Sequence, residues 1–411
     1  MTILIPQDVS QIINTLTKSG HEAFIVGGCV RDSVRGVRPK DWDITTSALP
    51  GQVAEIFPRT FETGIKHGTI TVLIGSQSYE ITTYRLDGEY LDNRRPEKVI
   101  FTTNIEEDLS RRDFTMNAIA YNPSRGFVDP FDGRGDIGKK IIRCVGDADC
   151  RFGEDALRML RAVRFAGQLG FTVDAAALEA IVARRSSLAN ISAERVREEL
   201  IRLITSPYVQ AVSLLESTGL LPYILAGNAF NGDLGQIIKL LADCPMQENL
   251  RLALFYSWSG DNCAKTLRDL RFDNKTIRDV CLYVDMLPIA IQHDRYEIKK
   301  ILRRMPQADN KCHRKTAQAY FENLLDLQKI INPHDDGRLE AIRRESRDIQ
   351  ASGECYTLRD LLVNGDDLAA AGVPRGKEIG EKLEEMLDAV MRDPAMNLSF
   401  CECFKEKISN M

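Results

Sequence analysis

The stretch from Phe24 to Ala48, FIVGGCVRDSVRGVRPKDWDITTSA, decides the fold of the N-terminal part of the chain. Its apolar start ends in Gly27 and Gly28, which predicts a buried strand, a tight turn and then a short helix. Asp41 and Asp43 follow, one residue apart, in a segment that predicts a second strand. Because side chains alternate along a strand, both carboxylates would share one face.

The glycine turn is a candidate site for a phosphate group. Glycine lets the backbone approach a ligand closely, and the helix that follows points free N–H groups into the same space. Arg31, in the first turns of this helix, is placed to reach a phosphate oxygen. A plain structural turn is the alternative interpretation of Gly27 and Gly28.

The two aspartates are candidate metal ligands. Two carboxylates on one face repel each other unless a cation lies between them, and Mg²⁺ takes one or two carboxylates together with substrate phosphates. Asp41 and Asp43 fit that description, with a solvated strand end as the alternative. Glu80, on a neighbouring predicted strand, is expected either to complete the metal cluster or to accept the proton of an attacking hydroxyl. An exposed strand glutamate is the plainer interpretation of Glu80. Together these residues predict a nucleotidyl-transfer centre.

Outside this stretch, the chain divides into a mixed and a helical part. Residues 7–19 predict an amphipathic helix, and residues 69–85 predict a β-hairpin around a GSQS turn. From about residue 150 helical periodicity dominates to the end. A loop rich in Asn, Pro, His, Asp and Gly at 331–338 predicts a boundary before a C-terminal domain.

The composition indicates a cytoplasmic protein without a membrane partner. The 411 residues suffice for roughly two to four domains, and no apolar run approaches the roughly 18 residues of a membrane span. The N-terminus has no secretory pattern, and ten cysteines without CxxC pairs indicate free thiols. The net charge of −5 argues mildly against a nucleic-acid partner, but basic clusters at 93–98 and 110–114 leave an RNA-binding face open.

The motifs resemble those of the class II tRNA nucleotidyltransferase and poly(A) polymerase family, whose catalytic head is shared with DNA polymerase β. The resemblance begins with GGCVRDSVRG and KDWDITTSA, covers about the first 200 residues in order, and is weaker in the C-terminal half. Its further motifs are TGIKHGTITV (63–72), RLDGEYLDNRRPEKVIF (85–101), EEDLSRRDFTMNAIAY (106–121) and RFGEDALRMLRAVRFAGQLGF (151–171). The similarity is greatest to bacterial enzymes that add CCA to tRNA.

The resemblance implies an α+β, DNA polymerase β-like nucleotidyltransferase head followed by an all-α neck, body and tail. We expect the head at residues 1–140, the neck at 141–210, the body at 211–335 and the tRNA-binding tail at 336–411. Two Mg²⁺ ions are expected on Asp41 and Asp43.

The motif SRRDFTMNA, residues 110–118, is expected to line the nucleotide pocket. Arg112 would hold the triphosphate, while Asp113 and Asn117 would contact the ribose hydroxyls. Without the resemblance, this motif would be interpreted as a solvated charged turn.

The segment EDALRMLRAVRF predicts one helix with Glu154, Asp155, Arg158, Arg161 and Arg164 at close spacing. By itself this pattern indicates ion pairs along a solvent-facing helix. A carboxylate only accepts hydrogen bonds and a guanidinium only donates them. Asp155 can therefore accept from the amino group of cytosine or adenine, and Arg158 can donate to the adjacent ring nitrogen. Guanine and uracil present the opposite order, so the pair selects C and A. Arg161 and Arg164 would hold phosphates or support the pair.

Two further segments match the family. The loop at 86–98 corresponds to one that helps such enzymes change from C to A addition and is shortened in CC-adding members. Here it is of full length, with Arg94, Arg95 and Pro96, which disfavours a CC-only enzyme. In the tail, a turn before a helix is placed either to contact RNA phosphates or simply to pack; its residues are Gly372, Pro374, Arg375, Gly376 and Lys377.

These features predict an enzyme that adds C, C and A to the 3′ end of tRNA from CTP and ATP, as a monomer or homodimer. The alternatives are an A-adding enzyme, a CC-adding enzyme, a poly(A) polymerase, or a non-catalytic tRNA-binding protein with a degenerate head. Only five histidines are present, with His-Asp pairs at 293–294 and 334–335, so no phosphohydrolase activity is expected.

Overall fold

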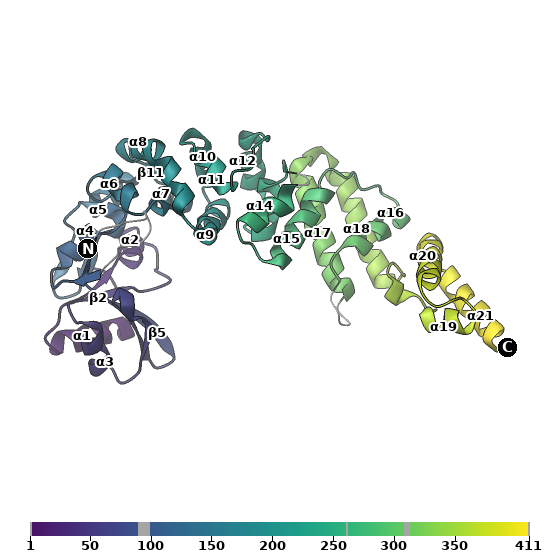
Figure 1. Cartoon of the computed structure of the whole chain (residues 1–411), viewed down its shortest axis with the longest axis horizontal. Coiled ribbons are helices and arrows are strands. Elements are labelled where there is room, and N and C mark those ends of the chain that lie inside the picture. Colours follow the sequence, from purple (N-terminus) through teal and green to yellow (C-terminus); the bar gives the residue numbers. More distant parts are fainter. Residues whose placement is uncertain (1, 89–98, 260–261, 308–312, 410–411) are drawn as a thin grey trace. The chain divides into compact units, whose positions relative to one another are not determined.

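The computed structural model describes residues 2–88, 99–259, 262–307 and 313–409, which form two compact units. The first unit comprises Met1–Ile238 and Lys265–Phe272, and the second comprises Lys239–Ala264 and Asp273–Met411. Figure 1 shows the strands confined to the N-terminal part of the chain, coloured purple to teal, and helices from there to the C-terminus.

A mixed seven-stranded sheet organises the start of the first unit, in the order β3-β4-β5-β2-β1-β8-β9. β2 and β5 run parallel, and the other neighbours are antiparallel. The strands are β1 (Ala23–Val26), β2 (Ile44–Thr46), β3 (Thr60–Gly64), β4 (Thr69–Ile74), β5 (Gln77–Thr83), β8 (Ala120–Asn122) and β9 (Gly126–Val128).

Five helices accompany this sheet: α1 (Gln7–Lys18), α2 (Gly28–Val34), α3 (Pro50–Ile56), α4 (Ile105–Ser110) and α5 (Gly133–Lys139). A separate antiparallel pair joins β6 (Arg85–Asp87) to β7 (Val99–Phe101). The core beneath the sheet includes Phe24 and Val26 of β1 packed with Leu109 of α4. The apolar run of β1 is thus buried, and the glycines that end it lie at the edge of this core.

The predicted helix at 7–19 and the hairpin at 69–85 are confirmed by α1 and by the antiparallel pair β4–β5. The strand predicted around the two aspartates is shorter than expected. β2 begins at Ile44, because only from there do both β1 and β5 pair with it. Asp41 and Asp43 therefore lie in the segment that leads into the strand, where Val26 N–H still donates to the Asp43 carbonyl at 3.0 Å.

The first unit continues as a group of helices: α6 (Ala148–Glu154), α7 (Leu157–Leu169), α8 (Ala175–Arg184), α9 (Ala193–Ile204), α10 (Ser213–Ser217) and α11 (Leu221–Ile224). α7 packs on α9, α6 packs on α8, and the short strands β10 (Ile141–Ile142) and β11 (Thr172–Val173) pair in parallel. The single helix predicted through Asp155 is wrong. Asp155 is extended (φ −137°, ψ 104°) and separates α6 from α7, and its own side chain accepts from Leu157 N–H at 3.1 Å.

In the described residues of the second unit, the regular secondary structure is helical. Its helices are α13 (Glu248–Phe255), α15 (Asn274–Met286), α16 (Arg295–Arg304), α17 (His313–Ile331), α18 (Asp336–Ser352), α19 (Gly365–Ala370), α20 (Lys377–Arg392) and α21 (Met396–Ser409), and α12 (Leu234–Asp243) and α14 (Cys263–Asp269) contain division points between the units. Single 3₁₀ turns occur at Ile65–His67, Thr115–Asn117, Arg185–Asn190, Val209–Val212, Pro333–Asp335 and Leu358–Asp360. The predicted fold class, an α+β head followed by helical domains, is confirmed, except that the predicted all-α neck also contains the short strands β10 and β11.

The predicted boundary loop at 331–338 contains a 3₁₀ turn between α17 and α18, which pack against each other. Further on, Val363, Leu368 and Met386 form a small core of their own with Phe400. The division of the chain into four domains remains a prediction. Over the described ranges, no helix is both long enough and apolar enough to cross a membrane.

Candidate active site

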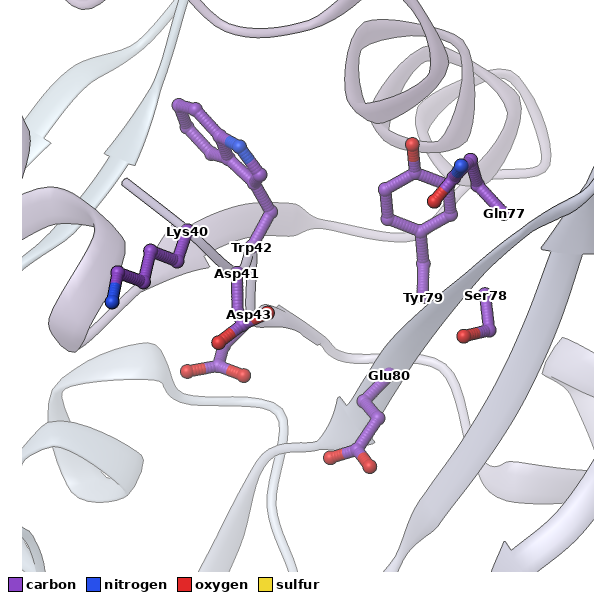
Figure 2. A pocket seen from close by; sticks show the side chains of 8 residues that line it. All are labelled: Lys40, Asp41, Trp42, Asp43, Gln77, Ser78, Tyr79 and Glu80. Carbon is purple, nitrogen blue, oxygen red and sulfur yellow. The ribbon is translucent and has the colours of Figure 1, made fainter. Parts of the chain in front are cut away.

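Three predicted carboxylates line one cavity of about 450 Å³ beside the start of β2: those of Asp41, Asp43 and Glu80. Figure 2 shows the Asp41 and Asp43 carboxylates close together and the Glu80 carboxylate turned to the same side. The register of β2 on β5 pairs Ile44 with Ile81, so Asp43 and Glu80 are the residues just before that pair. The parallel pairing thus brings residues from two distant motifs to one place.

Trp42 and Tyr79 point to the other side of the pocket in Figure 2. Alternation along a strand would turn Trp42 away from the two aspartates and into a core, but it is half-buried and lines a second cavity of about 790 Å³ together with the N-terminal residues Thr2–Pro6. Its opposite direction nevertheless follows the predicted alternation with the two aspartates.

Asp43 lies in an electrostatically unfavourable place for an anion. Its side chain is open to the pocket but enclosed by protein around it, and this desolvation raises the pKa of the carboxyl. The positive charge of Arg112 lowers the pKa, whereas Glu80 and Asp41 raise it further, and the net pKa is above the ordinary value. A cation in the pocket would relieve this repulsion.

The donor set fits Mg²⁺ bound jointly by protein and substrate. Across the described ranges, no three His, Cys, Asp or Glu side chains are gathered into a group that holds a metal alone. Asp41 and Asp43 would supply two carboxylates, and phosphate oxygens or water would complete the coordination, as Mg²⁺ commonly requires. Glu80 lines the same pocket and its negative charge contributes to raising the pKa of Asp43, so both predicted roles of Glu80 remain predictions.

The glycine turn lies against the predicted phosphate-binding arginines. Gly27 has φ +77°, and a Cβ there would stand 3.1 Å from Nη1 of Arg112, so a side chain would displace this guanidinium. Gly28 begins α2, and Arg31 on that helix donates to Asn117 Oδ1 at 2.8 Å. The structure thus brings together both predicted glycines, both arginines and Asn117.

Asp108 holds the two neighbouring arginines and was missed from the sequence. Its fully buried carboxylate accepts from Arg111 at 2.8 Å and from Arg112 at 3.1 Å. Burial acts to raise its pKa, but the charges of Arg112 and Arg111 outweigh burial and hold the pKa below the usual range. The spacing of three and four residues from the arginines along α4 was the available signal.

Asp113 and Asn117 form the centre of a buried network. Asp113 Oδ2 accepts from Arg161 Nε at 2.8 Å and from Nη2 at 2.6 Å, and Asp113 Oδ1 accepts from Asn117 at 3.1 Å. Burial acts to raise the pKa of Asp113, but Arg161 and the hydrogen bond from Asn117 lower it to about 2. Because Asn117 also binds Arg31, the network joins α2 in the head to α7.

Asp113→Asn is expected to lower the free energy of unfolding at pH 7 by about 2 kcal/mol, the linkage equivalent of the pKa depression. The folded pKa is depressed, so this stability is fully present above the ordinary carboxyl pKa near 3.8 and is lost as pH falls towards 2. Urea unfolding between pH 7 and 2.5 measures the difference. Asp269→Asn, an exposed change on α14, is the control; a difference between Asp113→Asn and wild type that is independent of pH would contradict the assignment.

The two predicted base-selecting residues lie at the break between α6 and α7. Asp155 is bound by Arg195 of α9 at 2.8 Å. Arg158 forms an ion pair with Glu154 and donates to the Arg111 carbonyl at 3.2 Å. This last bond joins α7 directly to the arginine motif of the head.

Arg161 and Arg164 surround one aromatic ring. The guanidinium carbons of Arg31, Arg161 and Arg164 lie 5.3, 5.4 and 4.0 Å from the centroid of Phe165. Arg164 also forms a buried ion pair with Glu199 at 2.5 Å, and its desolvation lowers the pKa of this arginine to about 10. Phe165 and Glu199 were not predicted from the sequence. Glu199 comes close to Arg164 only because α7 packs on α9.

The predicted loop residues Arg94, Arg95 and Pro96 lie outside the described part of the chain, and their role remains a prediction.

The remaining features fit one class of protein. A mixed sheet that presents a carboxylate pair beside a glycine turn and clustered arginines defines a nucleotidyltransferase.

The comparisons with known proteins agree. Residues 23–143 match the family "Poly A polymerase head domain", residues 170–228 match "Probable RNA and SrmB- binding site of polymerase A", and residues 245–398 match "tRNA nucleotidyltransferase domain 2 putative". The CCA-adding enzyme of Geobacillus kaustophilus is 38% identical over 97% of this chain and 94% of that protein. That of Geobacillus thermodenitrificans is 50% identical, over 55% of this chain and 56% of that protein.

A solved structure, that of the Bacillus stearothermophilus CCA-adding enzyme in complex with CTP, has a TM-score of 0.81. It is 31% identical and covers 99% of this chain and 100% of that chain. This chain therefore belongs to the family of bacterial CCA-adding enzymes and is a nucleotidyltransferase. Enzymes of this family are generally metal-dependent.

Proposed function

We propose that this enzyme adds C, C and A in turn to the 3′ end of tRNA, using CTP and ATP and no nucleic-acid template. The observation that carries the proposal is the junction of α7 with the head, where Arg158 donates to the Arg111 carbonyl and Arg161 binds Asp113. This junction supports a single nucleotide site with the phosphates on the head and the base on α7. The related structure with bound CTP supports the same substrate here.

In the proposed reaction, the 3′-hydroxyl oxygen of tRNA attacks the α-phosphorus of CTP or ATP. A new O–P bond forms, the bond to the β-phosphate oxygen breaks, and pyrophosphate leaves. Glu80 is proposed to accept the hydroxyl proton, because it shares the pocket with Asp41 and Asp43. The two aspartates are proposed to hold two Mg²⁺ ions, which when bound supply activation of the hydroxyl and neutralisation of the leaving charge.

The nucleotide is proposed to lie between the glycine turn and α7. Gly27, Gly28, Arg31 and Arg112 would contact the triphosphate, with Asp113 and Asn117 near the ribose. Since the side chains of Asp113 and Asn117 are engaged with Arg161 and Arg31, they would also keep these arginines in place. Arg161 and Arg164 would support the phosphates or the base-reading pair.

Base selection is assigned to Asp155 and Arg158. An acceptor-only carboxylate next to a donor-only guanidinium matches the amino group and ring nitrogen of cytosine and of adenine. With guanine or uracil, the Asp155 carboxylate would face a carbonyl oxygen and the Arg158 guanidinium would face an N–H group. Each unsatisfied group costs about 1–3 kcal/mol.

We assign tRNA recognition to the helical body at 211–335 and the tail at 336–411, with the head at 1–140 and the neck at 141–210. Arg375, in the turn before α20, and Lys377, the first residue of α20, support this assignment, since their side chains are 80% and 90% exposed. Contacts to the RNA backbone recognise the shape of the RNA and not its sequence. An enzyme that acts on tRNAs of different sequence requires recognition of this kind. We propose a cytoplasmic location and a monomer or homodimer.

An incorporation assay tests the proposal. Three tRNA transcripts, ending before CCA, after CC, and after CCA, are each given Mg²⁺ with single nucleotides and then with CTP and ATP together. We expect the first to gain CCA and stop, the second to gain A, and the third to stay unchanged. Growth only of the CC-ending transcript would instead show an A-adding enzyme. Growth that stops after CC would show a CC-adding enzyme, long A tails a polymerase, and no growth a binding protein.

A further inference from the structure

Arg195 of α9 is directed at the base-reading carboxylate. Its Nη2 donates to Asp155 Oδ2 at 2.8 Å, and its Nη1 lies 3.4 Å from Oδ1. Within the described part of the chain, Asp155 is the side chain to which Arg195 donates. The Arg195 side chain is 30% exposed and the Asp155 side chain 16% exposed, so solvent reaches this ion pair only partly.

Asp155 is held from a second direction by its own backbone. The break between α6 and α7 leaves Leu157 N–H free to donate to Oδ1 at 3.1 Å. A carboxylate has about four lone-pair positions, and Leu157 and Arg195 together occupy three of them. The protein therefore sets the plane of the carboxylate before any nucleotide binds. These bonds also fix the direction of the one lone-pair position that is left to accept a hydrogen bond.

The partner of Asp155 in base selection is held in a similar way. Arg158 is paired with the Glu154 carboxylate and donates to the carbonyls of Arg151 at 3.0 Å and Arg111 at 3.2 Å. Each base-reading side chain is thus fixed by a neighbour of opposite charge, Arg158 by Glu154 and Asp155 by Arg195.

We propose that Arg195 is a positioning residue that sets nucleobase specificity by fixing the carboxylate plane of Asp155. The inference rests on the proposed function, in which Asp155 accepts from the amino group of C or A. Discrimination against a carbonyl oxygen depends on the carboxylate facing it directly, because a carboxylate that can rotate avoids that contact or bridges it with water. Without Arg195, Asp155 is still a hydrogen-bond acceptor, but its carboxylate can rotate. The enzyme then discriminates less strongly against uracil and guanine.

The test compares Arg195→Gln with Arg195→Lys and with Arg202→Gln, an exposed arginine change on the same helix that lacks the contact with Asp155. kcat and KM are measured for CTP and UTP on tRNA ending before CCA, and for ATP and GTP on tRNA ending in CC. For Arg195→Gln we expect KM for CTP and ATP to rise about tenfold, as for one charge-assisted hydrogen bond, with kcat changed less. The CTP:UTP and ATP:GTP preferences should fall by a similar factor. Arg195→Lys should restore part of the preference, and Arg202→Gln should behave as wild type.

A double variant shows whether Arg195 acts through Asp155. Asp155→Asn combined with Arg195→Gln should be no less selective than Asp155→Asn alone, since residues that act as one unit are not additive. Wild-type preference in Arg195→Gln, or additive losses in the double variant, would overturn this inference alone. If selectivity does not depend on Asp155 at all, the proposed base reading is overturned, and this inference with it.

Discussion

Asp43→Asn is expected to reduce nucleotide incorporation by roughly a thousandfold or more while leaving tRNA binding intact. The amide keeps the size of the side chain but removes the negative charge of one of the two proposed metal ligands. Asp41→Ala should have the same effect, because Asp41 supplies the other carboxylate. Incorporation of labelled CMP and tRNA binding by filter retention measure the two properties separately.

The Asp43→Asn variant is also expected to differ from the wild type in its stability against unfolding. The pKa of Asp43 is raised in the folded protein by desolvation and by Glu80 and Asp41, against the opposing charge of Arg112. The folded state therefore binds this proton more tightly than the unfolded chain, and ionisation of Asp43 costs stability as pH rises above the usual carboxyl range. Without metal at pH 7, Asp43→Asn should unfold at a temperature equal to or above that of the wild type.

Added Mg²⁺ should raise the unfolding temperature of the wild type by mass action and have no such effect on Asp43→Asn. Glu55→Gln, which removes an exposed carboxylate from α3, is the matched control and should behave as wild type in every assay. Normal incorporation by Asp41→Ala or Asp43→Asn, or an equal response of wild type and Asp43→Asn to Mg²⁺, would show that the metal lies elsewhere.

Asp155→Asn is expected to lower kcat/KM for CTP and ATP by about 10- to 100-fold and to narrow their preference over UTP and GTP. An asparagine carries both a donor and an acceptor, so it can turn its NH₂ group towards the carbonyl oxygen of uracil or guanine. Arg158 would still oppose the ring N–H of these bases, so selectivity should narrow without inverting. Single-nucleotide incorporation with each of the four triphosphates measures the change.

Asp149→Asn is the control for this variant. Asp149 belongs to α6, which ends just before Asp155, but its side chain is 49% exposed and pairs with Arg184. It should leave all four kcat/KM values close to wild type. An Asp155→Asn enzyme that keeps the wild-type CTP:UTP ratio would remove Asp155 from base selection and leave Arg158 or the backbone as the selecting group.

Much of the fold could be predicted because it depends on local pattern. The alternation at 69–85 and the helical period at 7–19 report which face of each segment is buried, and both segments formed as expected. The glycine pair and the aspartate pair could be predicted as candidate site residues, because glycine adopts the positive φ of a tight turn at little cost and two carboxylates on one face favour a bound cation. The start of β2 at Ile44 was missed, since it depends on where two neighbouring strands begin to pair with it.

The sequence by itself determined the order of elements, the carboxylate pair and the residue types suited to reading C and A. Only the tertiary structure decided how these groups are held. The contact of Asp155 with Arg195 and the burial of Asp113 against Arg161 depend on α7 packing against α9 and against the head. Hydrogen bonds and ion pairs between residues tens of positions apart leave no local period in the sequence, because their energy depends on distance and burial and not on spacing along the chain.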